Sequence, residues 1–144
     1  MRTGGLVRRV IASVVEPHGI TQQQYNVLRI LRGAGEKGLP TLEIADRMIE
    51  ETPGITRLID RLELKRLVTR ERSATDRRQV FCRITPDGLT LLARLDEPIA
   101  EAEREALGIL SERQLTQLLS LLDRARGGLH AALETRRGEQ ALIA

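Results

Sequence analysis

The chain has 144 residues, of which 41% are hydrophobic and 30% charged, and a formal net charge of +3, which fits one folded domain with or without an oligomerising extension. Only Tyr25 and Phe81 are aromatic, so the core must be mainly aliphatic, and this favours helices. The single cysteine, Cys82, excludes an internal disulfide framework and a cysteine-based zinc site, and no apolar run approaches the ~20 residues of a transmembrane helix.

Hydrophobic residues recur at helical spacing from the start of the chain. Leu6, Val10 and Val14 predict a short amphipathic helix, which Pro17 and Gly19 end.

A capping box predicts the start of the next helix, in ITQQQYNVLRILRGAG. Thr21 is the expected N-cap and Gln24, three residues later, its partner. Gly33 and Gly35 are expected to end this helix.

Two further helices are predicted before residue 66. The segment LPTLEIADRM gives a short helix with Leu42 and Ala45 facing inward. The segment ETPGITRLIDRLELK gives another, with Thr52 as N-cap and Pro53 at the first helical position. Its buried stripe is expected to consist of Ile55, Leu58, Ile59 and Leu62.

A β-hairpin with a charged tip is predicted next, because the alternating segments LVTRER and QVFCRI are joined by the polar SATDRR. Val68 on one strand, and Val80, Cys82 and Ile84 on the other, would pack on the core. Cys82 is therefore predicted to be a buried, inert thiol; the alternative, a redox sensor, has no second cysteine to resolve a sulfenic acid.

Helices return after the hairpin. Thr85 and Pro86 start one that runs through LTLLARLDEPIAEAEREAL, and Pro98 should kink it because its ring removes the bond to the carbonyl of Arg94.

The last predicted helix begins at Ser111, which forms a capping box with Gln114. The closing residues, ETRRGEQALIA, are expected to fray. The apolar residues of this helix are Leu115, Leu118, Leu119 and Leu122.

Positive charge is concentrated between residues 57 and 83, which hold nine Lys or Arg and four Asp or Glu, a net charge of +5. Two short helices followed by a basic two-stranded hairpin are the plan of a winged helix-turn-helix. Clustered guanidinium groups release counterions on contact with DNA. Double-stranded DNA is therefore the predicted partner.

A solvated, salt-bridged surface helix is an alternative interpretation of part of this charge, which the basic hairpin makes less favoured. Arg57, Arg61 and Lys65 lie at i, i+4 and i+8, beside Asp60 and Glu63.

Four strings together resemble the MarR family of bacterial transcriptional regulators: DRRQVFCRITPDG, TRLIDRLELKRLVTR, GITQQQYNVLRIL and ILSERQLTQLLSLLD. The resemblance covers roughly residues 18–125. It implies a mainly α (α+β) fold, with a winged helix-turn-helix lobe at 21–85 and a helical dimerisation region formed by 1–20 and 86–135. Residues 136–144 would be a flexible tail. It also implies a homodimer, most often a repressor, on a pseudo-palindromic operator.

The resemblance also implies roles for single residues. The recognition helix would run from Pro53 to Lys65. At the wing, Asp76 would orient an arginine and Arg78 would enter the minor groove. Arg77, beside them, would contact phosphate. Arg70 would anchor the wing or the backbone. The implied DNA-binding residues are Thr52, Gly54, Thr56, Arg57, Arg61, Arg70, Asp76, Arg77 and Arg78.

The chain departs from the family pattern beside the recognition helix. Arg66 stands where the family usually has a left-handed glycine, at a cost of about 1 kcal/mol. Glu50 and Glu51 precede the helix, where they would repel phosphate.

No cofactor, metal site or catalytic motif is predicted. His18 and His130 lack neighbouring ligand residues, and no phosphate loop or nucleophile elbow occurs. His18 is a candidate for lining a crevice that binds a small aromatic or phenolic ligand. The first 19 residues have too broken an apolar stretch for a signal peptide, so a cytoplasmic location is expected.

Two functions fit these features. One is a DNA-binding transcriptional regulator that a small molecule releases from its operator. The other is a winged-helix module whose basic hairpin docks an acidic protein surface without sequence-specific DNA binding.

Overall fold

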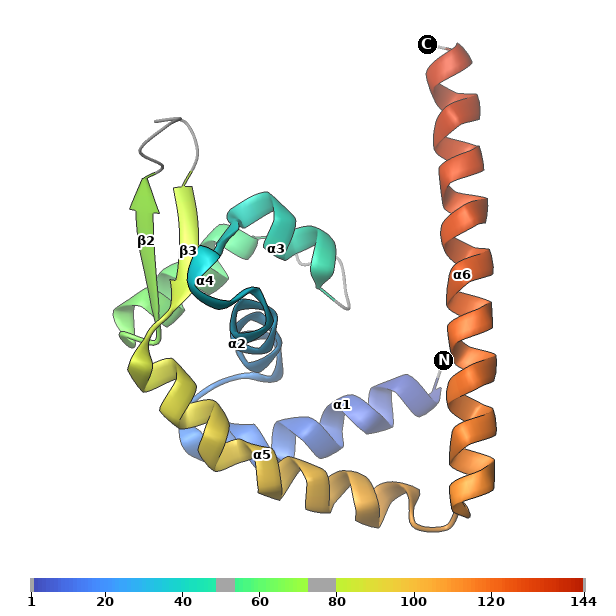
Figure 1. Cartoon of the computed structure of the whole chain (residues 1–144), viewed down its shortest axis with the longest axis horizontal. Helices are drawn as coiled ribbons and strands as arrows, with labels where there is room; N and C mark the ends of the chain where they lie inside the picture. The colour runs from blue at the N-terminus through green and yellow to red at the C-terminus, as the bar shows by residue number, and fades with distance from the viewer. Residues whose placement is uncertain (1, 49–53, 73–79, 144) are drawn as a thin grey trace. The chain divides into compact units, whose positions relative to one another are not determined.

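The computed structural model describes residues 2–48, 54–72 and 80–143 (Figure 1). It is mainly helical with one small antiparallel sheet, which confirms the predicted mainly α (α+β) class. The chain divides into two compact units, residues 1–104 and 105–144.

The first unit opens with α1, Arg2–Val15, followed by the 3-10 helix η1, Glu16–His18. Gly19 closes η1 in the left-handed conformation with φ 76°. The predicted first helix and its stop are therefore confirmed. Val15 is fully buried, whereas about half of Leu6 remains exposed in the single chain.

Helix α2, Gln22–Ala34, begins with the predicted capping box. The Gln24 backbone N–H donates to Thr21 Oγ1 at 3.2 Å, and the Thr21 N–H donates to Gln24 Oε1 at 3.1 Å. Gly35 is the C-cap. Its buried apolar face comprises Tyr25, Val27, Leu28 and Leu31.

A short strand that the sequence does not predict follows the 3-10 helix η2, Gly35–Lys37. This strand, β1 (Leu39–Pro40), pairs antiparallel with β3. Two residues are too few to show an alternating pattern, so sequence periodicity cannot reveal β1. Gly38 enters β1 with φ 63°.

Helix α3, Thr41–Arg47, corrects one prediction. Leu42 does not face inward, because 77% of it is exposed, whereas Ile44 is fully buried. Ala45 is half-buried. Seven residues make only two helical turns, and over so short a segment the apolar spacing barely distinguishes the two faces of the helix.

Helix α4, Ile55–Leu64, is the predicted recognition helix, but its bounds differ from Pro53 to Lys65. Gly54 is the N-cap with φ 97°, and Lys65 is the C-cap. The predicted N-cap Thr52 and Pro53, with Glu50 and Glu51, lie outside the described residues. The predicted buried stripe is confirmed at Leu58, Ile59 and Leu62, and Ile55 packs against it.

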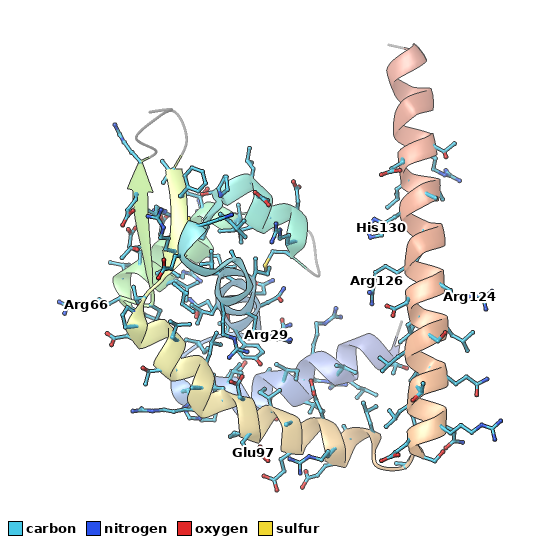
Figure 2. The ribbon with its side chains drawn as sticks, in the orientation of Figure 1. Arg29, Arg66, Glu97, Arg124, Arg126 and His130 are labelled. Atoms are coloured by element: carbon cyan, nitrogen blue, oxygen red, sulfur yellow. The ribbon has the colours of Figure 1, made fainter. Side chains whose placement is uncertain are left out.

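Arg66 follows α4 with φ 58°, and among the described residues it is the only non-glycine with positive φ. The position therefore keeps the left-handed conformation that the family pattern implies, although the side chain is arginine. Figure 2 shows Arg66 projecting away from the ribbon.

The predicted hairpin consists of β2, Val68–Arg72, and β3, Val80–Ile84. The sheet order is β1-β3-β2, and Arg70 stands opposite Cys82. Cys82 is fully buried, with Sγ 3.7 Å from Thr41 Oγ1. Val68 is buried as predicted, whereas Val80 and Ile84 are half-buried.

Helix α5, Pro86–Leu107, starts where the sequence predicts. The Gly88 N–H donates to Thr85 Oγ1 at 3.1 Å, which caps the first turn. The helix continues through Pro98. Its buried residues Leu92, Leu95 and Ile99 join the aliphatic core of the first unit.

The second unit is built on α6, Glu112–Ile143. The predicted capping box is confirmed, since the Ser111 N–H donates to Gln114 Oε1 at 2.8 Å and the Gln114 N–H donates to Ser111 Oγ at 3.4 Å. The helix continues through residues 136–143, whereas the sequence predicts a flexible tail from residue 136 onward.

Candidate nucleic-acid interface

Helix α4, the predicted recognition helix, turns its leucine and isoleucine stripe to the core and its polar residues to solvent. Thr56, Arg57 and Arg61 are exposed, and exposed Gly54 precedes them at the N-cap. Arg57 and Arg61 are four residues apart, so they lie on one face of the helix. Neither guanidinium group has an ion-pair or hydrogen-bond partner among the described residues.

Arg70, on strand β2, makes three contacts with α4. Its Nη1 lies 2.6 Å from Asp60 Oδ1 and 3.2 Å from Glu63 Oε2, and its Nη2 donates to the Thr56 carbonyl at 3.1 Å. Burial lowers the pKa of Arg70, but the hydrogen bond to Asp60 and the two carboxylate charges outweigh this and raise the pKa above its usual value. One planar guanidinium therefore joins the wing strand to two turns of the recognition helix.

This arrangement decides against the salt-bridged helix considered from the sequence. Asp60 and Glu63 are paired with Arg70 rather than with the arginines of their own helix. Among the described residues, no carboxylate of α4 forms an ion pair with Arg57 or Arg61, so the positive charge of these two side chains is not neutralised by their own helix.

Lys65, the third basic residue of the same series, has a structural position. Its Nζ donates to the Gly19 carbonyl and lies 3.5 Å from Gln24 Oε1. Lys65 is thus directed to the connection between α1 and α2 and differs in role from Arg57 and Arg61.

A third internal contact fixes the base of the wing. Arg83 on β3 donates through Nε to the Glu36 carbonyl at 2.6 Å and through Nη1 to Glu71 Oε2. Arg72 lies two residues beyond Arg70 on the same side of β2 and is exposed.

The basic segment therefore contains two kinds of cation. Lys65, Arg70 and Arg83 hold the lobe together. In this segment, the exposed cations whose side chains have neither an ion-pair nor a hydrogen-bond partner among the described residues are Arg57, Arg61, Arg66 and Arg72. A surface of exposed guanidinium groups on a helix and an adjoining strand suits a polyanion.

The predicted DNA-binding residues fall into three groups. Gly54, Thr56, Arg57 and Arg61 come together on or beside α4, whereas Arg70 is held by internal contacts. Arg72 was not predicted, although its spacing of two from Arg70 on an alternating strand could have indicated it. Those outside the described residues are Thr52, Asp76, Arg77 and Arg78.

Outside this surface, the described residues bear on three other features: a metal site, a membrane span and a cavity. The described part of the chain has no group of three or more His, Cys, Asp or Glu that could hold a metal ion, and no helix of the length and hydropathy needed to cross a membrane. His18 is exposed in η1. A cavity of about 340 Å³ lies where α2, η2, β3 and α5 meet, lined by Arg32, Gly35, Glu36, Arg83, Ile84 and Leu89.

Known proteins share this architecture. The HTH-type transcriptional regulator MhqR of Bacillus subtilis (strain 168) is 32% identical over 117 residues, which are 81% of this chain and 78% of MhqR. A MarR transcription factor from Planctomyces limnophilus, known as a crystal structure, is 38% identical with a TM-score of 0.66, over 85% of this chain and 88% of that one.

The fold is also that of an S. aureus MepR–DNA complex, with a TM-score of 0.78 at 24% identity, over 88% of this chain and 93% of that one. The model of the MarR family matches residues 18–79, which include helix α4 and strand β2. From its sequence, its winged lobe and these relatives, the chain belongs to the MarR family of transcriptional regulators.

Proposed function

We propose that the chain is a homodimeric DNA-binding repressor that places two copies of α4 and of the wing on a pseudo-palindromic operator. Such a regulator acts on the chromosome, so the proposal includes a cytoplasmic location and no catalytic role. The resemblance of the chain to transcriptional regulators along most of its length supports this proposal.

One observation carries the proposal. Arg70 holds both carboxylates of α4, and this leaves Arg57 and Arg61 exposed on the same helix. A helix that keeps its cations unneutralised on one face can bind phosphates and base edges in the major groove.

Gel-shift titration with the DNA upstream of the gene tests the proposal. Wild type should bind with a steep salt dependence and give a footprint of two-fold symmetry. Arg61→Ala should reduce the affinity. It should also reduce the slope of log K against log salt by about one, because one phosphate contact is lost. Arg124→Ala, which removes an exposed arginine from α6, is the matched control and should change neither.

Equal effects of the two variants, or the absence of any salt-dependent specific complex, would contradict the proposal. The alternative protein-docking module predicts that second result.

The wing contributes through Arg78 in this proposal. Arg78→Ala should weaken operator binding by ~1–3 kcal/mol while the fold and the dimer persist. Unchanged affinity would remove Arg78 from the interface.

Dimerisation is supported by apolar residues that a single chain leaves in water. Between 39% and 86% of each of these side chains is exposed, which is unfavourable for a monomer. They are Leu107, Ile109, Leu118, Leu119, Leu121, Leu122, Leu129 and Leu133.

Ligand control is the remaining part of the proposal. The cavity between α2, β3 and α5 combines the guanidinium groups of Arg32 and Arg83 with the apolar Ile84 and Leu89, a combination suited to a small aromatic acid or phenol. Thermal-shift screening with such compounds should raise the melting temperature for those that bind the folded state. A ligand that also releases the operator would support the proposed control.

A further inference from the structure

The turn after α4, residues 65–67, contacts the two segments at which the winged lobe begins and ends in the sequence. We call these residues the post-recognition turn. Its hydrogen bonds lead to the connection before α2 and to the start of α5, which are the two places where the lobe joins the proposed dimerisation region.

On one side, the Lys65 ammonium is held at the α1–α2 connection. It donates to the carbonyl of Gly19, the residue that closes η1, and it lies 3.5 Å from Gln24 Oε1. That same oxygen accepts the Thr21 N–H of the capping box, and Gln24 is 2% exposed. Lys65 and Gly19 are exposed, so the contact joins the end of α4 to a surface connection whose capping-box residue Gln24 is buried.

On the other side, the turn is bonded to the N-cap of α5. Thr85 Oγ1 donates to the Arg66 carbonyl at 2.7 Å, and the Thr85 N–H donates to the Leu67 carbonyl at 3.1 Å. A Cβ on Gly88 would lie 2.5 Å from the Leu67 carbonyl oxygen, so the first turn of α5 approaches the turn closely.

We infer that Lys65 is a positioning residue that sets the orientation of α4 relative to α1 and α5, the helices of the proposed dimerisation region that adjoin the lobe, with the post-recognition turn as the connection. This inference rests on the proposed function. Two recognition helices must match half-sites about one turn of DNA, ~34 Å, apart, and a lysine held at the end of each helix restricts how that spacing can vary.

The chemistry of the contact supports this role over direct DNA binding. The ammonium already has two oxygen acceptors within the protein. A cation at the C-terminus of α4 also complements the helix dipole. Arg57 and Arg61, earlier in the helix, have no such partners in the described residues.

The test compares Lys65→Met with wild type on two duplexes, one with the full footprinted operator and one with a single half-site. Lys65→Met should weaken binding to the full operator about 3- to 30-fold, the usual range for residues that couple two sites. Affinity for the single half-site and the salt slope should stay unchanged, because the simultaneous fit of two helices is what is lost. Lys65→Arg should restore most of the affinity.

Arg61→Met, one turn earlier on the same helix, is the matched control. It should weaken binding to both duplexes and reduce the salt slope by about one. If Lys65→Met does not fold as a dimer, Lys65→Gln, which keeps a donor but loses the charge, takes its place in the same comparison.

Two results would overturn the inference. One is a Lys65 variant that behaves like Arg61→Met on both duplexes, which would make Lys65 a phosphate contact. The other is unchanged affinity for the full operator. Failure of wild type to bind any upstream DNA would instead overturn the proposed function.

Discussion

Tyr25 is buried in an aliphatic core, with 5% of its surface exposed. Burial raises the pKa of its phenol, because the phenolate would lose its hydration. Arg29 opposes this, and its guanidinium carbon lies 5.8 Å from the ring centroid. The effect of burial is larger than that of Arg29, so the pKa of Tyr25 stays raised and the phenol remains neutral in the folded protein at a pH where a free tyrosine ionises.

The stability of the protein should therefore fall at high pH. The neutral form is favoured on folding, so the contribution of Tyr25 is complete below a pH of about 10 and is lost as the pH rises through the raised pKa. Phenolate absorbance isolates this residue, because the chain has one tyrosine and no tryptophan. A native titration midpoint at or below that of the unfolded chain would contradict the expectation.

Arg66 shows how a backbone requirement outweighs a residue preference. Its φ of 58° costs a non-glycine residue roughly 1 kcal/mol. The bonds from Thr85 to the carbonyls of Arg66 and Leu67 hold the turn in that form.

Replacement at this position should show the strain. Arg66→Gly should raise the free energy of unfolding by up to ~1 kcal/mol, since relief of strain exceeds the added entropy of the unfolded chain. Arg66→Val should lower it by about 1–2 kcal/mol, because a β-branched side chain is worse in the left-handed region. Denaturant unfolding measures both, and the opposite order of the two variants would refute this account.

At the scale of elements, strong local signals predict correctly and weak ones do not. The capping boxes Thr21–Gln24 and Ser111–Gln114 fix two helix starts through bonds between residues three apart, so sequence suffices. The short α3 has no such signal, and its inward face was predicted wrongly at Leu42. Strand β1 forms because it pairs with β3, and this pairing joins residues that are more than forty positions apart in the sequence, Leu39 with Cys82 and Pro40 with Phe81.

The entry to β1 gives a test at this scale. A Cβ on Gly38 would lie 2.5 Å from the Cys82 carbonyl oxygen, and φ is 63°. Gly38→Ala should therefore lower the free energy of unfolding by about 2 kcal/mol or more, through both the clash and the strained φ.

Gly33→Ala is the matched control for this substitution. Gly33 lies in α2 and has no atom within 4 Å of an added Cβ. Alanine there should raise the free energy of unfolding by about 0.5–1 kcal/mol. Similar losses from both variants would show that close packing at Gly38 is not the cause.

At the scale of the whole molecule, α6 has an apolar surface that its own unit does not cover. Residues spaced by seven form two rows, as in helices that pair along their length. One row is Leu115, Leu122 and Leu129, and the other is Leu118, Ala125 and Ala132.

Disruption of this surface should dissociate the proposed dimer. Leu122→Glu should weaken dimerisation by about 2–4 kcal/mol, because it places a charge in an apolar contact. Ser120→Glu, on the opposite side of α6, should leave the dimer intact. Sedimentation equilibrium measures both, and an unaffected Leu122→Glu dimer would place the interface elsewhere.

The sequence by itself determined the order of helices and hairpin, the capped helix starts and the concentration of positive charge, because these depend on spacing within a few residues. Only the tertiary structure decided what each cation does. Arg70, Lys65 and Arg83 bind partners 7 to 47 residues away in the chain, whereas Arg57 and Arg61 stay exposed. Composition counts these guanidinium and ammonium groups alike, but within the described residues the folded chain brings carboxylates and carbonyls to some of them and none to the side chains of Arg57 and Arg61.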